Sequence, residues 1–153
     1  MVRLPIEHRT ALAMVVGALR DATAPWWIIA GTAVALHAPV PVAVDDIDVL
    51  IGMADVPLVS AMPGLLIRTG DGDDLFRSRF YAALKMGGVD VEFMAGFDLR
   101  HGSRWEPVWP RSRVMLPLGE GLSIPVPDRD ELVAMLARFG RDKDLARIAL
   151  LSD

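Results

Sequence analysis

The spacing of apolar residues divides the first third of the chain into alternating helical and extended segments. Apolar positions recur at helical spacing through Ile6–Ala22 and predict an amphipathic helix. Trp26–Ala30 is a short run of aromatic and β-branched residues, which predicts a buried strand. A second helix is expected over Thr32–His37, because it opens directly after Gly31 and ends before Pro39.

The middle of the chain shows the period-2 and short apolar runs that are typical of strands. Strands are expected at Asp45–Ile51, Leu65–Arg68, Phe80–Met86, Val89–Met94, Val114–Leu118 and Leu122–Val126. Glycines at Gly87-Gly88 and around Glu120 suit tight hairpin turns between consecutive strands. The stretch Asp98–Arg113 is rich in Trp, Arg and Pro and predicts an irregular loop.

The end of the chain predicts two helices. Asp128 is placed as an N-cap, with Glu131 at the spacing of a capping box. Gly140 separates the first helix from a second that runs to about Leu151. These elements predict an α+β fold with a mixed β-sheet of about five strands and helices packed on one face. We expect one domain over residues 1–153, with its core in 26–94 and a C-terminal hairpin and helices in 114–151.

Composition narrows the class of protein. The chain has 153 residues, 52% of them apolar, which suffices for one domain with a substantial core. No apolar run reaches the roughly 20 residues of a membrane span, and the first residues lack a signal-peptide pattern. Cysteine is absent, which excludes thiolate chemistry and fits a cytoplasmic location. The net charge of −4 argues against a broad nucleic-acid surface.

Carboxylates alternate along two of the expected strands. Asp46 and Asp48 share one face of their strand, and Asp90 and Glu92 share a face of another. Carboxylates from neighbouring strands are the ligands that Mg²⁺ prefers, usually together with substrate phosphates. We expect Asp46 and Asp48 to bind metal, with Asp90 as the third carboxylate in preference to Glu92, because Asp90 lies nearer the hairpin turn. Alternatively, the acidic positions are only a solvated strand face.

Other polar groups have two interpretations each. Gly31 allows close approach of a phosphate to the backbone, and Thr32 adds a hydroxyl donor. Arg141 and Lys143 either contact a triphosphate or pair charges at the surface. Residues 71–74 hold three aspartates, which favour a plain turn over a calcium site. Trp105 and its neighbouring Trp and Arg residues either stack on a nucleotide or pack the loop, and packing is favoured.

In their order, Gly31-Thr32, Asp46-Ile47-Asp48 and Val89-Asp90-Val91 resemble the signature of the DNA polymerase β-type nucleotidyltransferase superfamily. The tail, Val126–Leu132 followed by Gly140–Leu145, is similar to small bacterial, or minimal, nucleotidyltransferase-like proteins, some of which are halves of toxin–antitoxin pairs. The resemblance implies transfer of a nucleoside monophosphate from an NTP to a hydroxyl, with Mg²⁺. The acceptor implied is a tRNA, a protein or a small molecule.

Departures from the superfamily's usual pattern suggest an alternative function. Val42 and Val44 stand where many members carry Arg and Thr, and Leu136 stands where the small relatives often carry Lys. These positions favour a catalytically weak or inactive protein that binds a partner, such as one half of a toxin–antitoxin pair. A chain of 153 residues also leaves little room for a separate acceptor-recognition domain. A partner protein or a homo-oligomer would then supply that surface.

Overall fold

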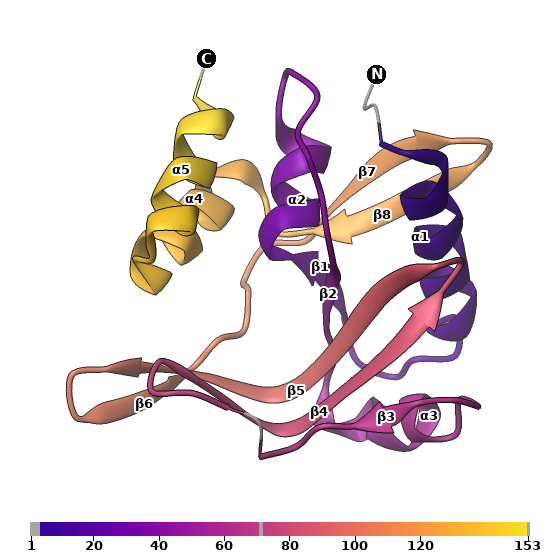
Figure 1. Cartoon of the computed structure of the whole chain (residues 1–153), viewed down its shortest axis with the longest axis horizontal. Coiled ribbons are helices and arrows are strands. Elements are labelled where there is room, and N and C mark those ends of the chain that lie inside the picture. Colours follow the sequence, from indigo (N-terminus) through magenta and orange to yellow (C-terminus); the bar gives the residue numbers. More distant parts are fainter. Residues whose placement is uncertain (1–3, 71, 153) are drawn as a thin grey trace.

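A computed structural model describes residues 4–70 and 72–152 (Figure 1). Its helices are α1 (Ile6–Ala18), α2 (Ala30–His37), the 3₁₀ turn η1 (Met53–Asp55), α3 (Val56–Ser60), α4 (Arg129–Phe139) and α5 (Asp142–Leu151). Its strands are β1 (Trp27–Ile29), β2 (Ile47–Leu50), β3 (Leu66–Ile67), β4 (Phe76–Met86), β5 (Val89–His101), β6 (Arg104–Pro107), β7 (Val114–Gly119) and β8 (Leu122–Val126). One residue of the predicted aspartate turn, Asp71, lies outside the described residues.

The main sheet is mixed. Its strand order is β1-β2-β5-β4-β3, and β6 pairs with the far end of β5. Strands β2 and β5 run parallel, whereas the other pairs in this sheet are antiparallel. Strands β7 and β8 form a separate antiparallel hairpin. The predicted α+β class with a mixed sheet is confirmed.

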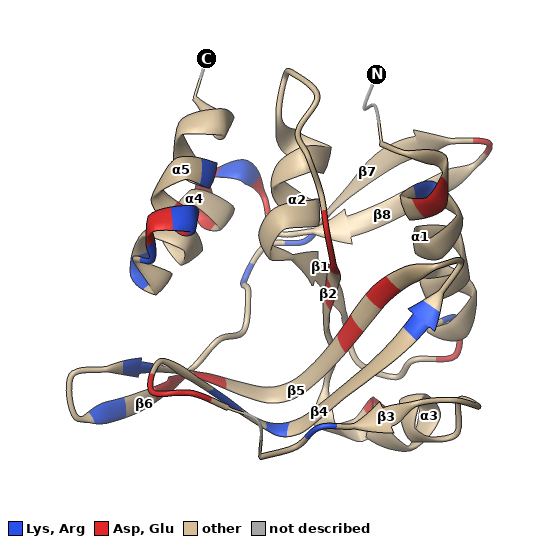
Figure 2. Ribbon diagram, in the orientation of Figure 1, with Lys and Arg blue, Asp and Glu red and all other residues tan. Residues whose placement is uncertain are grey.

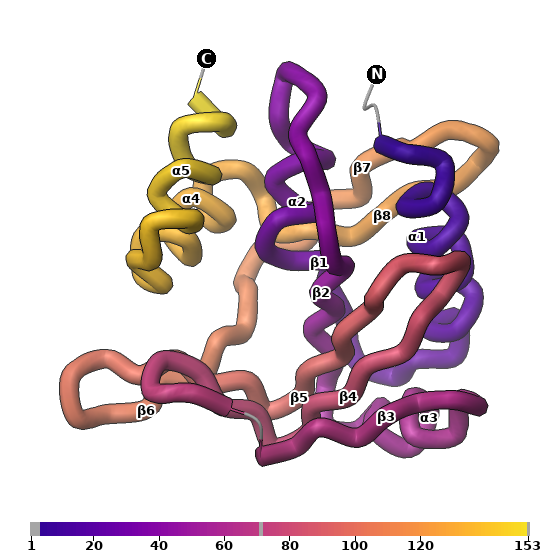
Figure 3. The backbone as a smooth tube through the Cα atoms, in the orientation of Figure 1, coloured from indigo at the N-terminus to yellow at the C-terminus, as the bar shows by residue number. Residues whose placement is uncertain are grey.

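Helices cover the sheet and close the core. In the tube view, α2, α4 and α5 stand together above the long β4–β5 hairpin, and α1 runs along its other end (Figure 3). Leu12 of α1, Phe93 of β5 and Leu136 of α4 are completely buried, so all three parts of the chain contribute to one core. No helix among the described residues is both long and apolar enough to cross a bilayer.

The expected local signals set several boundaries. Gly87 and Gly88 have φ of +59° and +84° and form the β4–β5 turn. The Asp128 carboxylate accepts the backbone N–H of Glu131 at 2.8 Å and so caps α4. Gly140, with φ +68°, ends α4 in the left-handed conformation. Glu131 does not complete the capping box, because its carboxylate accepts hydrogen bonds from the Arg111 and Ser112 backbone.

Two predicted elements need correction. The first helix ends at Ala18, one turn before the predicted Ala22. Asp98–Arg113 is not an irregular loop throughout, because β5 continues to His101 and pairs with β6 through a turn at Gly102. The alternation of buried Leu99 with its polar neighbours carried this signal. The resulting β5–β6 hairpin extends the sheet on one side of the molecule.

Candidate active site

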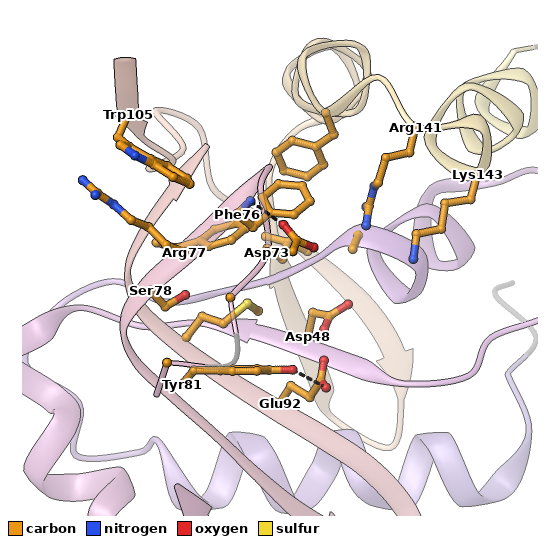
Figure 4. Close-up of a pocket in the computed structure, with 17 residues that line it drawn as sticks. Asp48, Asp73, Phe76, Arg77, Ser78, Tyr81, Glu92, Trp105, Arg141 and Lys143 are labelled. Carbon is orange, nitrogen blue, oxygen red and sulfur yellow. Dashed lines mark hydrogen bonds between the residues drawn. The ribbon is translucent and has the colours of Figure 1, made fainter. Parts of the chain in front are cut away.

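Two carboxylates meet at the centre of the main sheet. The parallel register of β2 and β5 sets Asp48 directly opposite Glu92, close enough for the charge of Glu92 to act on Asp48. The Tyr81 hydroxyl of β4 donates to Glu92 Oε1 at 2.6 Å. Figure 4 shows the three side chains together below the cleft. We call Asp48 and Glu92 the carboxylate pair.

Burial and like charge make this pair difficult to ionise fully. Burial is the largest cause of the raised pKa of Asp48, the interaction with Glu92 adds to it, and together they bring this pKa to about 8. The pKa of Asp46 is also raised, first by burial and then by the charges of Glu92 and Asp90. Two adjacent carboxylates repel each other unless they share a proton or a cation. The donor set therefore fits a hard divalent cation.

The structure places the two candidates for the third carboxylate in different surroundings. Asp46 lies immediately before β2 and is exposed beside the pair. Asp90 is also exposed, but it forms an ion pair with Lys85 at 2.9 Å and does not line the cleft. Glu92 occupies the position beside Asp48 that the sequence pattern favoured for Asp90, because the register pairs Asp48 with Glu92. Within residues 4–70 and 72–152, no three Asp, Glu, His or Cys side chains form a preassembled metal cluster.

The glycine corner also differs from expectation. Helix α2 begins at Ala30, so Gly31 lies in its first turn and not ahead of it. Ala30 has φ +56°, a left-handed conformation that is unfavourable for alanine and makes the sharp bend out of β1. Thr32 is completely buried, and its hydroxyl donates to the backbone carbonyl of Asp46 at 3.0 Å. Thr32 thus holds the segment that carries Asp46, and its hydroxyl is not directed at a ligand.

A cleft of about 420 Å³ opens above the carboxylate pair. Figure 4 shows Arg77 and Trp105 on one side and Arg141 and Lys143 of α5 on the other. Figure 2 shows acidic positions on β2 and β5, and basic positions interleaved with acidic ones near the start of α5. The cleft therefore combines a negative centre with positive sides, an arrangement that suits a metal ion and a polyphosphate together.

The two predicted cations of α5 are held differently. Arg141 donates from Nε and Nη2 to the buried carboxylate of Asp144, at 2.6 and 2.9 Å, and its guanidinium lies 4.9 Å from the centre of the Phe76 ring. Lys143 forms no ion pair with a described residue, and its charge partly offsets the acidic environment of Asp46. Both residues line the cleft, whereas Gly31 and Thr32 do not.

The tryptophans of the predicted loop have separate roles. Trp105 lies in the cleft with the Arg77 guanidinium 4.4 Å from its ring centre. Trp109 packs edge-on against Trp27 at 4.7 Å, as the packing interpretation predicts. Asp73 accepts the backbone N–H groups of Leu75 and Phe76, which is turn chemistry.

Among the cleft residues that sequence reasoning missed, Tyr81 and Arg77 make the most specific contacts. Both lie on β4, and the only available signal was the period-2 spacing that Tyr81 shares with its strand neighbours. The contacts of Tyr81 with Glu92 and of Arg77 with Trp105 depend on how β4, β5 and β6 pair. No local sequence pattern specifies that pairing.

Comparison with solved structures shows which known fold this architecture matches. A Thermotoga maritima protein assigned as a nucleotidyltransferase superposes with a TM-score of 0.74 at 20% identity, covering 97% of this chain and 93% of its own. The chain has the nucleotidyltransferase fold. The antibiotic-resistance factor ANT(2″)-Ia shares it, with TM-scores of 0.58 in complex with adenylyl-2″-tobramycin and 0.61 in solution. Both of these matches are 14% identical and cover 94% and 97% of this chain, and 87% and 84% of ANT(2″)-Ia.

The nucleotidyltransferase fold is recognisable here from shape alone. No protein-family model matches the chain, and no curated protein matches it in sequence. At 14–20% identity, the resemblance is carried by the arrangement of the sheet and the closing helices.

Proposed function

We propose that this protein transfers a nucleoside monophosphate from a nucleoside triphosphate to a hydroxyl acceptor, using Mg²⁺. The observation that carries the proposal is the carboxylate pair at the bottom of a cleft whose side bears Arg141 and Lys143. The nucleotidyltransferase fold supports it. A carboxylate centre beside a cationic wall is what phosphoryl transfer requires, because that chemistry depends on positioning and charge neutralisation.

Asp48 and Glu92, with Asp46 beside them, are the residues that would hold the metal ion. Mg²⁺ is usually bound by one or two carboxylates together with substrate phosphates, so a preassembled cluster of three is not required. When bound, Mg²⁺ offsets the negative charge that develops on the phosphates. A bound cation would also offset the burial and the like charge of Glu92 that together raise the pKa of Asp48 to about 8.

The remaining residues bind and orient the substrates. Lys143 and Arg141 contact the triphosphate from the α5 side. The acceptor oxygen attacks the α-phosphorus, the bond to the β-phosphate breaks, and pyrophosphate leaves. The hydroxyl proton passes to a carboxylate oxygen of Glu92, which Tyr81 holds in place. The acceptor is a tRNA, another protein or a small molecule, bound directly or through a partner subunit.

The test is transfer of label from α-³²P-labelled NTPs in the presence of Mg²⁺, with RNA, protein and small-molecule fractions as acceptors. Asp48→Asn removes one negative charge from the centre and is expected to lower the rate by about 100-fold or more. Asp130→Asn, an exposed change in the first turn of α4, serves as the matched control and retains the wild-type rate. Equal labelling by wild type and Asp48→Asn would refute the proposal.

An outcome in which Mg²⁺ and NTP bind but no acceptor is labelled would favour the alternative, an inactive partner-binding protein. Leu136 fits that alternative, since it is completely buried in the core and offers no cation to the cleft. Calorimetry with Mg²⁺·NTP gives an earlier test that needs no acceptor, because a protein that binds no Mg²⁺·NTP cannot transfer its nucleotide and leaves only the alternative.

A further inference from the structure

A buried carboxylate on α5 has no role in the proposed reaction as described so far. Asp144 is completely buried, yet both of its oxygens are engaged by cations. Arg141 binds it through two nitrogens, and Arg147 Nη1 lies 3.6 Å from Asp144 Oδ1 on the other side. A buried charge persists only when it is paired, so this carboxylate needs both arginines.

From their shared contact with Asp144, the two arginine side chains extend in different directions. Arg141 extends over the Phe76 and Phe139 rings into the cleft. Arg147 reaches the first turn of α2, where its Nη2 lies 2.9 Å from the position that a β-carbon on Gly31 would occupy. Arg147 is also close enough to Asp48 for its charge to act on that carboxylate. Arg147 therefore lies against Gly31 and near Asp48.

This arrangement changes the role of Gly31. The sequence suggested that glycine allows a phosphate to approach the backbone, but in the structure it allows a guanidinium to approach. The Arg147 side chain keeps about a quarter of its surface exposed, and its contact with Asp144 engages only one edge of the guanidinium. The other nitrogens are left to donate to an anion.

We propose that Arg147 is a third polyphosphate-binding residue, and that Asp144 is the positioning residue that orients Arg147 and Arg141 toward one triphosphate. With Lys143, these arginines form the cationic face of α5. The inference rests on the proposed function, because it assigns the triphosphate of the same substrate. Arg147 binds the phosphates beside Gly31 and the carboxylate pair, while Arg141 and Lys143 bind from the cleft.

The test measures binding by calorimetry, without turnover. The probes are a non-hydrolysable ATP analogue and AMP, each with Mg²⁺, against wild type, Arg147→Gln, Arg147→Lys and Arg138→Gln. Arg138 lies on α4 and pairs with Glu106, so its variant removes the same charge outside the cleft. Arg147→Gln is expected to weaken binding of the ATP analogue at least tenfold and binding of AMP less than twofold. Arg147→Lys is intermediate, because lysine keeps the charge but loses the planar fork.

Asp144→Asn provides a second measurement. A melting curve shows whether this variant folds. If it folds, it is expected to bind the ATP analogue more weakly than wild type, with a smaller loss for AMP, because both arginines lose their orientation. If Asp144→Asn does not fold, the binding data of the Arg147 variants alone decide whether the inference holds. Wild-type affinity in Arg147→Gln, or equal weakening of ATP analogue and AMP, would overturn the inference alone. Failure of wild type to bind the ATP analogue would overturn the proposed function as well.

Discussion

At the scale of single residues, Glu92 and Asp90 of strand β5 lie in different environments. Glu92 accepts a hydrogen bond from the Tyr81 hydroxyl, lies opposite Asp48 in the sheet, and lines the cleft. Asp90, two residues earlier on the same strand, is paired with Lys85 outside the cleft. Two acidic residues at alternate positions of one strand thus have different environments.

A matched pair of variants distinguishes these residues. Glu92→Gln removes a carboxylate from the pair and is expected to slow nucleotidyl transfer about 100-fold, because the negative centre loses a charge. Asp90→Asn removes the same charge outside the cleft and is expected to stay within about threefold of wild type. Single-turnover rates with a labelled NTP measure both. A larger loss in Asp90→Asn than in Glu92→Gln would return the third carboxylate to Asp90.

The sequence contained these carboxylates but not their arrangement. Asp46, Asp48, Asp90 and Glu92 could be selected by their period-2 spacing. Which carboxylate of β5 meets Asp48 depends on the register of two parallel strands that lie about forty residues apart in the chain. Register is set by the whole buried face of a sheet, so a local motif cannot specify it. The contact of Arg147 with Gly31 is equally non-local.

At the scale of elements, hydrophobic period and turn chemistry predicted most strands and helices. The Gly87-Gly88 hairpin, the Asp128 cap and the break at Gly140 each depend on a few adjacent residues, and all are present. The β5–β6 hairpin was missed because its tryptophan, arginines and prolines gave the composition of a loop. The composition of this segment hid the alternation of buried and exposed residues that the pairing of β5 with β6 shows.

Asp55 illustrates an element held by one buried carboxylate. It accepts the Thr23 and Ala24 backbone N–H groups at 2.7 and 2.9 Å and thereby joins η1 to the segment before β1. Burial alone raises the pKa of Asp55, but these hydrogen bonds and that of the Thr23 hydroxyl outweigh burial and lower the pKa. A carboxylate with a lowered folded-state pKa stabilises the protein above the ordinary Asp pKa of about 3.9.

Asp55→Asn is therefore expected to reduce the free energy of unfolding at pH 7 by about 1–3 kcal/mol. The contribution of wild-type Asp55 is lost as the pH falls through its folded-state pKa, so the two proteins converge in strongly acidic solution. Urea denaturation across pH 3–7 measures the difference. A difference that stays constant over this range would contradict the assignment to the ionised carboxylate.

At the scale of the whole molecule, the cleft lies between the sheet and the C-terminal helices. Phe139 at the end of α4 contacts Phe76 of β4, with ring centres 5.0 Å apart, and so joins these two parts beside the cleft. A triphosphate held by the carboxylate pair through a metal and by α5 through its cations would link them a second time. Ligand binding should then stabilise the entire fold.

Mg²⁺ and a non-hydrolysable NTP analogue together are expected to raise the melting temperature by about 5–10 °C at a ligand concentration 100 times the Kd. Mg²⁺ alone should give a smaller increase, because it engages only the carboxylates. Differential scanning fluorimetry of wild type and Asp48→Asn checks this. An identical increase in the two proteins would show that the ligand binds elsewhere.

The cationic face of α5 is encoded within seven consecutive positions, 141–147, whereas its acidic counterparts are embedded in the sheet. If this segment holds the triphosphate as proposed, substitutions within it would change polyphosphate affinity without altering the strands that carry Asp48 and Glu92. Such modularity would let natural variation or protein engineering change how tightly a polyphosphate is held while the acidic positions of the sheet stay the same.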